Sequence, residues 1–199
     1  MQITTVNSLK PVLAACAAAM LFLPSIVLSG EDTEGTRPPN VSLVLVGHGG
    51  VPNDYPNLKE FFRLHDKGGE EFEKIEEEMI HWPRTESNDS YWEGFMRVVG
   101  EIRNSGKYHS VHPAFNEFCA PTVDEALAAA TATKPDVIIV TSIMLTPGGV
   151  HSERDIPASI ESFKEENPSI RIIYAWPYDL REVAQFVNAQ STKFIQDRP

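Results

Sequence analysis

The apolar residues of this chain gather in short continuous runs that are separated by segments with helical spacing. Val41–Val46 and Val137–Met144 are nearly continuous apolar, β-branched runs, which are typical of strands covered on both faces of a parallel sheet. Two shorter runs, Tyr108–Phe115 and Ile170–Ala175, are further strand candidates. Between and after these runs, apolar spacing of three and four residues predicts helices over Tyr91–Arg103, Thr122–Thr133, Ser152–Glu166 and Asp179–Gln190.

This alternation of strands and helices predicts an α/β fold with right-handed crossovers. We expect a flavodoxin-like three-layer sandwich, in which a parallel sheet of about four strands in the order 2-1-3-4 has helices on both faces. The third of the four helices has a predicted start signal, because Ser152-x-x-Asp155 resembles a capping box and Pro157 lies in the first turn.

A helical insertion at about 52–83 follows the first strand. It holds two predicted helices, 57–66 and 70–81, which Gly68-Gly69 separates. Its acidic run over 70–78 is most simply a solvated helix face, and we favour this over a lid above a cleft. The expected buried stripe consists of Phe61, Phe62, Phe72, Ile75 and Met79.

Residues 1–29 have the pattern of an export signal. Lys10 precedes an almost wholly apolar run from Pro11 to Leu28, and Val27-Leu-Ser29 is a usable cleavage signal. Pro24 and Ser25 favour a cleaved signal peptide over an N-terminal membrane anchor. Residues 30–40 are polar and predict a disordered tether, which leaves 41–199 as a single α/β domain. We therefore expect an exported protein, either periplasmic or membrane-anchored and facing the periplasm.

Charge and cysteine content narrow the classes of partner. The formal net charge of −11 argues against nucleic acid or an anionic membrane surface as a partner, so any membrane contact would run through an uncleaved leader. The hydrophobic fraction of 42% is sufficient for a buried core. If the leader is removed, Cys119 is the last cysteine of the chain, and no intramolecular disulfide can form.

Two histidines stand in glycine-rich turns directly after the two clearest strand candidates. His48 lies in Gly47-His-Gly-Gly50, and His151 follows Gly148-Gly-Val150. In a doubly wound sheet, ligands bind beyond the carboxyl ends of the strands where the strand order reverses, which here is between these two strands. Glu117 follows the second strand and should emerge at the same edge. Two imidazoles and one carboxylate can hold a divalent metal and leave coordination positions open.

These residues resemble a known family. Gly47-His48-Gly49, Ala114-Phe115-x-Glu117-x-x-x-Pro121 and Gly148-Gly149-x-His151-x-x-x-Asp155-Ile156-Pro157 are similar, in the same order, to motifs of the small class II chelatases of the CbiX type. The resemblance implies a chelatase-like fold and a lyase that inserts Co²⁺ or Fe²⁺, with Ni²⁺ as a third candidate, into sirohydrochlorin or a related tetrapyrrole. It implies His48, His151 and Glu117 as metal ligands and proton acceptors, no organic cofactor, and a homodimer.

A second hypothesis belongs to another functional class. The leader, and departures from the family pattern such as Val150 before His151, favour a non-catalytic periplasmic protein that binds metal or tetrapyrrole with the same fold. A hydrolase is not favoured, because no Gly-x-Ser-x-Gly elbow accompanies the Gly-His-Gly-Gly turn.

Overall fold

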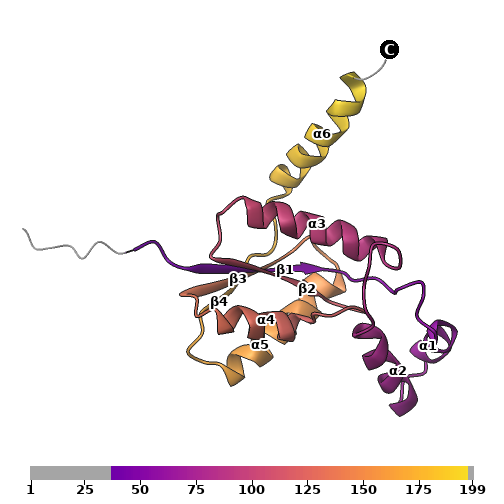
Figure 1. Cartoon of the computed structure of the whole chain (residues 1–199). Helices are drawn as coiled ribbons and strands as arrows, with labels where there is room; N and C mark the ends of the chain where they lie inside the picture. Colours follow the sequence, from indigo (N-terminus) through magenta and orange to yellow (C-terminus); the bar gives the residue numbers. More distant parts are fainter. Residues whose placement is uncertain (1–36, 197–199) are drawn as a thin grey trace, which may run out of the picture. The chain divides into compact units, whose positions relative to one another are not determined.

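The computed structural model of the protein, described over residues 37–196, centres on a four-stranded parallel sheet (Figure 1). The strands are β1 (Val41–Gly47), β2 (Ser110–Phe115), β3 (Val137–Ser142) and β4 (Ile172–Tyr174). Their order is β2-β1-β3-β4 and every pairing is parallel. This confirms the predicted α/β class and the order 2-1-3-4.

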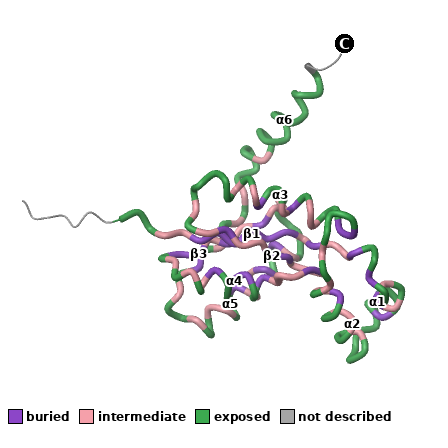
Figure 2. Tube along the Cα trace, in the orientation of Figure 1, coloured by how far each residue is buried: buried purple, intermediate pink, exposed green. Residues whose placement is uncertain are grey.

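Helices cover the two faces of the sheet unequally. On one face lie α4 (Val123–Ala132) and α5 (Ile156–Glu166), whereas α3 (Ser90–Asn104) lies on the other (Figure 1). The final helix, α6 (Leu180–Gln196), leads away from the sheet, and its residues are almost all exposed (Figure 2). The third layer is therefore incomplete over the β3 and β4 half of the sheet.

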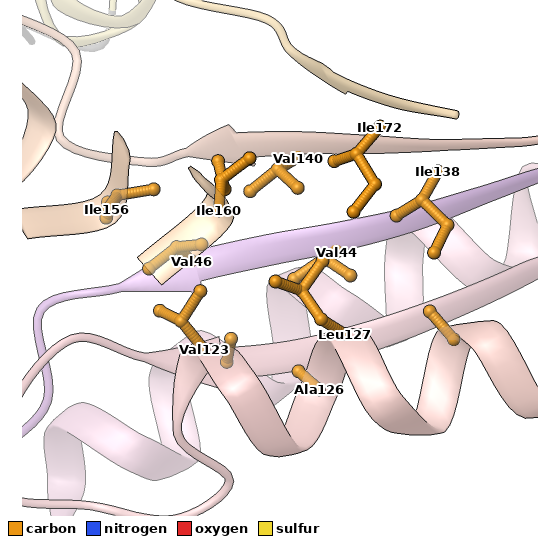
Figure 3. Close-up of a cluster of buried hydrophobic side chains, with 12 residues drawn as sticks. Val44, Val46, Val123, Ala126, Leu127, Ile138, Val140, Ile156, Ile160 and Ile172 are labelled. Atoms are coloured by element: carbon orange, nitrogen blue, oxygen red, sulfur yellow. The ribbon is translucent and has the colours of Figure 1, made fainter. Parts of the chain in front are cut away.

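Alternation along β1 divides the apolar core into two clusters. Val44 and Val46 point to the α4 and α5 side, where they pack with Leu127 and Ile160 (Figure 3). Leu43 and Leu45 point to the opposite side and pack against α3. Because successive side chains of a strand face opposite ways, a continuous apolar run fills both clusters at once. This explains why the pattern in the sequence identified β1 so clearly.

The register of the strands determines which loops meet. Gly47 at the end of β1 pairs with Phe115 at the end of β2, and Val46 pairs with Ser142 at the end of β3. All three carboxyl ends therefore reach the same edge of the sheet. The loops that follow these strands begin next to one another, as a doubly wound sheet requires.

The insertion after β1 folds into two helices, α1 (Leu58–His65) and α2 (Glu70–Ile80). They build a small core of their own around Tyr55, Phe61 and Met79. The expectation that Phe62 is buried was wrong, since it is 59% exposed. The reason is helical geometry: α1 buries Phe61 and Leu64, and the next residue after Phe61 is turned about 100° away from that face.

The predicted leader, 1–29, lies outside the described residues, as does most of the predicted tether. Where the chain becomes described, Asn40 is tied to the domain, because its backbone nitrogen donates to a carboxylate oxygen of Asp136 at 2.7 Å. Within residues 37–196, no helix combines the length and the apolar character that are needed to cross a bilayer.

His81 connects the insertion to α4 and gives the fold a pH-dependent contact. Its Nδ1 lies 3.0 Å from the carbonyl oxygen of Glu77, and its Nε2 lies 3.2 Å from Oε1 of Glu125. Both partners are acceptors, so only the protonated ring donates to both. The hydrogen bond to the Glu77 carbonyl, followed by that to Glu125, raises the pKa of His81 above its ordinary value of 6.5.

We expect this contact to stabilise the fold at acidic pH and to weaken at alkaline pH. A folded-state pKa above the unfolded value gives a contribution that is complete below the unfolded pKa and is lost as pH rises through the folded pKa. The melting temperature of the wild-type protein should therefore exceed that of His81→Gln near about pH 6. The difference should shrink towards about pH 9, because His81 loses its proton in between. A constant difference across this range would contradict the prediction.

Candidate metal centre

Three side chains from three different loops meet at the carboxyl edge of the sheet. His48 follows β1, Glu117 follows β2, and His151 begins the turn that leads into α5. One ligand atom from each lies within 4.8 Å of the others, and they form the one such group of three or more ligating side chains found among residues 37–196. The structure therefore brings together all three residues that the sequence predicted.

The geometry leaves a space between the three groups that suits one ion. Nε2 of His151 lies 3.5 Å from Oε1 of Glu117, and Nε2 of His48 lies 3.9 Å from Oε2 of the same carboxylate. The centroids of the two imidazoles are 4.9 Å apart, and the rings are nearly perpendicular at 85°. Ligand bonds to a first-row dication are about 2.0–2.2 Å long, so these separations need only small side-chain rotations to converge on one metal.

His48 is oriented by its own loop. Its Nδ1 lies 3.1 Å from the carbonyl oxygen of Gly49. Because a carbonyl only accepts, Nδ1 is the donor, and Nε2 is left as the nitrogen that can bind a metal. The backbone nitrogen of His48 donates to the hydroxyl of Tyr91 on α3 at 2.7 Å. The ring is therefore held from the loop side while its free nitrogen faces Glu117.

His151 is oriented by two residues that were not predicted to act at the metal centre. Its Nδ1 lies 2.8 Å from Oδ2 of Asp155 and 2.7 Å from the side-chain amide of Asn116. A carboxylate acceptor requires a proton on Nδ1, so the amide of Asn116 must turn its oxygen rather than its N–H group towards the ring. Nε2 is then left unprotonated to face Glu117. Such a carboxylate behind a ligating histidine is the usual outer-sphere arrangement of protein metal sites.

This arrangement replaces the predicted capping box at Ser152 and Asp155. Neither side chain caps a helix, because the chain enters α5 through a π-helical turn, η1 (His151–Asp155). The wider turn places residue 155 beside the ring of residue 151. A spacing of four residues between histidine and aspartate was the signal in the sequence, but it fits a capping segment equally well.

The loops of His48 and Glu117 are in direct backbone contact. The backbone nitrogen of Glu117 donates to the carbonyl oxygen of His48 at 2.9 Å, and that of Asn116 donates to Gly47 at 3.0 Å. Gly49 has φ +105°, and a Cβ there would lie 1.8 Å from the carbonyl oxygen of Glu117. Glycine is therefore required at position 49, because it lets these two loops touch.

The site is open to solvent and has an incomplete set of donors. The side chains of His48, Glu117 and His151 are 42%, 33% and 22% exposed. Three protein ligands leave at least one coordination position for water or substrate, as in reactive rather than structural metal sites. The hydrogen bond from His151, followed by that from Arg154, lowers the pKa of Asp155, so this outer carboxylate stays charged at neutral pH.

The remaining candidate ligands do not join the site. Cys119 is buried, and burial raises the pKa of its thiol to about 11, so it stays protonated and is a poor ligand at neutral pH. His109 precedes β2 and lies at the other end of the sheet, and His112 is bound to the hydroxyl of Ser110. None of these three side chains therefore contributes to the candidate metal centre.

A family comparison identifies the chain. The family model described as CbiX matches residues 86–191, which is more than half of the sequence. The chain belongs to the CbiX family. The matched region includes Glu117, His151 and Asp155, whereas His48 lies before it. The match confirms the family that the sequence motifs resembled, the small chelatases of the CbiX type.

The chain is similar to several known proteins, in sequence or in structure. A sirohydrochlorin cobaltochelatase of Methanopyrus kandleri is 36% identical over 61 residues, which are 31% of this chain and 42% of that protein. The chain thus matches less than half of the length of this curated relative. Solved structures include the sirohydrochlorin chelatase SirB of Bacillus subtilis in complex with cobalt (18% identity, TM-score 0.48, covering 69% of this chain and 43% of SirB). A putative cobalamin biosynthesis CbiX protein of Marinobacter aquaeolei has 16% identity and a TM-score of 0.49, covering 79% and 99% of the two chains.

Proposed function

We propose that this CbiX-family protein is a chelatase that inserts Co²⁺ or Fe²⁺, with Ni²⁺ as a third candidate, into sirohydrochlorin or a related tetrapyrrole. The observation that carries the proposal is the open group of His48, Glu117 and His151 at the carboxyl edge of the sheet. The similarity to a sirohydrochlorin cobaltochelatase supports the choice of substrate class.

The geometry suits the chemistry of metal insertion. A hydrated dication must lose water and be held by few protein ligands, so that the macrocycle can take it over. Two pyrrole N–H protons leave as the dication exchanges its water and protein ligands for the four ring nitrogens, and these protons need acceptors. The Nε2 atoms of His48 and His151 and the carboxylate of Glu117 provide both functions in turn, first as ligands and then as bases.

The donor set also predicts modest selectivity among metals. Imidazole and carboxylate bind the later first-row dications generally, with affinities that follow the Irving–Williams order. Metal supply therefore decides which ion is inserted. The proposal needs no organic cofactor, because the reaction involves only ligand exchange and proton transfer.

The direct test is turnover by the purified wild-type protein. Anaerobic incubation with sirohydrochlorin and Co²⁺, Fe²⁺ or Ni²⁺ should, for at least one of these metals, change the absorption spectrum of the tetrapyrrole faster than the same mixture without protein. A rate equal to the uncatalysed background, with all three metals, would reject the proposal.

The second candidate function is a non-catalytic carrier of metal or tetrapyrrole. The same open site would support it, and the export pattern of residues 1–29 favours it. A carrier retains one equivalent of metal or pigment through gel filtration and shows no turnover, whereas a chelatase releases both. Equilibrium binding measured beside the turnover assay therefore separates the two functions.

We also propose that the protein is exported, either periplasmic or anchored by an uncleaved leader. The support is the charged start, apolar run and cleavage signal within residues 1–29. The mass of the protein recovered from a periplasmic fraction tests this. Recovery of the full-length chain in the cytosol would contradict it.

We further propose a homodimer, with α6 as part of the interface. Phe186 and Phe194 are 64% and 68% exposed, and Val187 and Ile195 lie beside them. An apolar groove of about 430 Å³ is lined by Val183 and Phe186 at the start of the helix and by Val98 and Ile143. Aromatic side chains bury about 150–250 Å² each, so the four phenylalanines of two such helices supply a substantial part of a stable interface of about 1,200–2,000 Å².

Phe194→Glu should therefore shift the protein from dimer to monomer. We expect at least about a tenfold weaker self-association, because one buried aromatic anchor typically contributes 2 kcal/mol or more. Light scattering coupled to gel filtration measures it. Gln185→Glu, on the opposite side of the same helix, is the matched control that adds the same charge. A wild-type protein that is monomeric at high concentration would contradict the dimer.

A further inference from the structure

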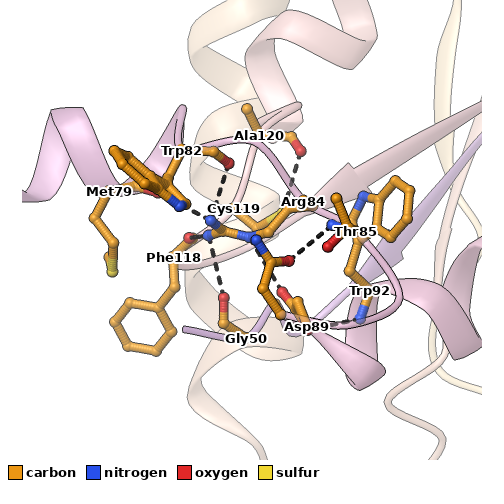
Figure 4. Close-up of polar contacts among 12 residues, drawn as sticks. Gly50, Met79, Trp82, Arg84, Thr85, Asp89, Trp92, Phe118, Cys119 and Ala120 are labelled. Atoms are coloured by element: carbon orange, nitrogen blue, oxygen red, sulfur yellow. Dashed lines mark hydrogen bonds and ion pairs between the residues drawn. The ribbon is translucent and has the colours of Figure 1, made fainter. Parts of the chain in front are cut away.

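A buried arginine lies behind the candidate metal centre and touches none of its ligands' side chains. Arg84 and Asp89 are 4% and 3% exposed, and Nε of Arg84 lies 3.1 Å from Oδ2 of Asp89 (Figure 4). Arg84 directly follows the insertion, and Asp89 caps α3 by accepting from the backbone nitrogen of Trp92 at 2.9 Å. A buried ion pair is costly to desolvate and is weak support for stability alone, so its contacts need a different explanation.

The guanidinium joins three separate segments of the chain. Its Nη1 donates to the carbonyl oxygens of Met79 and Trp82, at 3.2 and 3.0 Å, at the end of the insertion. Its Nη2 donates to the carbonyl oxygen of Gly50 at 3.3 Å and to that of Phe118. Figure 4 shows these hydrogen bonds around the planar guanidinium group. A rigid guanidinium fork can satisfy several carbonyls at fixed angles, whereas a lysine ammonium cannot reproduce the pattern.

Two of these carbonyls belong to the loops that carry metal ligands. Gly50 lies two residues after His48, and Phe118 directly follows Glu117. Phe118 has a positive φ of 60°, a conformation that costs a bulky residue free energy and persists only when its surroundings impose it. The bond from Arg84 to its carbonyl is one such constraint, and it acts on the residue that directly follows Glu117.

Asp89 extends the same connection to His48 through a second path. Its Oδ1 would lie 3.0 Å from a Cβ at Gly50, so the carboxylate packs directly against the His48 loop. Two residues further along, the hydroxyl of Tyr91 accepts from the backbone nitrogen of His48. The Arg84–Asp89 pair thus contacts both ligand loops and the start of the helix that supports one of them.

We propose that Arg84 is a positioning residue, which fixes the separation of His48 and Glu117 and so sets the affinity of the site for its cation. The inference rests on the proposed metal-binding role of these two residues. It also gives the insertion at about 52–83 a function, because carbonyl groups at its end hold this arginine, which directly follows it, at the rear of the site.

Arg84→Lys is the variant that tests this, with Arg103→Lys as the matched control. Arg103 also donates from its guanidinium to a strand carbonyl, that of Val111, at 3.1 and 2.8 Å. Val111 is near the start of β2, at the end of the sheet away from the site. Both variants keep the positive charge and lose the fork, and comparing their loss of Co²⁺ affinity with their loss of thermal stability separates positioning from general destabilisation.

The measurements are Co²⁺ affinity by calorimetry, the visible absorption of bound Co²⁺, which reports its coordination geometry, and thermal unfolding. We expect Arg84→Lys to weaken Co²⁺ binding by about tenfold or more, the effect typical of outer-sphere residues, and to alter the Co²⁺ spectrum. Arg103→Lys should leave both unchanged even if it lowers the melting temperature.

Three outcomes would overturn the inference, and they differ from one another. Arg84→Lys with wild-type affinity and spectrum rejects the positioning role while the proposed function stands. Equal weakening in Arg103→Lys assigns the effect to general destabilisation. A wild-type protein that binds no Co²⁺ rejects the proposed function itself. If Arg84→Lys does not fold, Asp89→Asn replaces it, because the asparagine oxygen can still cap α3 while the ion pair is lost.

Discussion

The double variant His48→Ala, His151→Ala is expected to bind no measurable Co²⁺ and to show only the uncatalysed rate of tetrapyrrole metallation. Each histidine supplies one of three converging ligand atoms, so its loss leaves too few donors to compete with water. Each single variant should weaken binding by at least about 100-fold, more than the loss of an outer-sphere partner. Calorimetry with Co²⁺ and the absorption assay with sirohydrochlorin measure the two effects.

The control for these variants is His109→Ala, which removes an exposed imidazole at the opposite end of the sheet. It should leave affinity and rate unchanged. Glu117→Gln adds information, because it keeps the shape of the side chain and removes its charge. We expect weaker Co²⁺ binding and a lower rate, since the amide neither attracts the dication nor accepts a proton as a carboxylate does. Full activity in either single histidine variant would contradict the assigned ligand set.

Gly49→Ala is expected to destabilise the fold by more than about 2 kcal/mol and to disrupt metal binding as well. The position has φ +105°, and the added methyl group would meet the backbone oxygen of Glu117 at 1.8 Å. Backbone cannot rotate away as a flexible side chain can, so the two ligand loops must separate. Incompatible substitutions at positive φ are costly even without a clash. Urea unfolding and Co²⁺ calorimetry measure the two losses.

Gly68→Ala is the matched control for this prediction. Gly68 also has a positive φ, +63°, but a Cβ there would meet no atom within 4 Å. The cost at Gly68 should be about 1 kcal/mol, from the left-handed backbone alone, with no change in metal affinity. If both glycine variants behaved alike, the close approach of the two loops would not be what position 49 requires.

The pattern in the sequence predicted the sheet well for a local reason. A parallel strand that is buried on both faces consists largely of consecutive apolar residues, as in Val41–Val46, so the run itself predicts the burial. The order 2-1-3-4, expected of a flavodoxin-like sheet, then placed His48, Glu117 and His151 at one edge, and the structure has that order. Where a helix buries only one narrow stripe, as in α1, neighbouring apolar residues were harder to distinguish, and Phe62 was placed on the wrong face.

The residues that support the candidate ligands could not be predicted from the sequence, because their roles depend on contacts that only the folded chain creates. Asp155 resembled a capping residue until the π-helical turn placed it behind His151. Arg84 gave no signal at all, since its partners are carbonyl groups, which every residue possesses. The sequence by itself determined the α/β class and the three candidate ligands at the ends of its strands, because periodicity and residue type carry that information. Only the tertiary structure decided how those side chains are oriented, because loop packing and backbone hydrogen bonds leave no pattern in the order of residues.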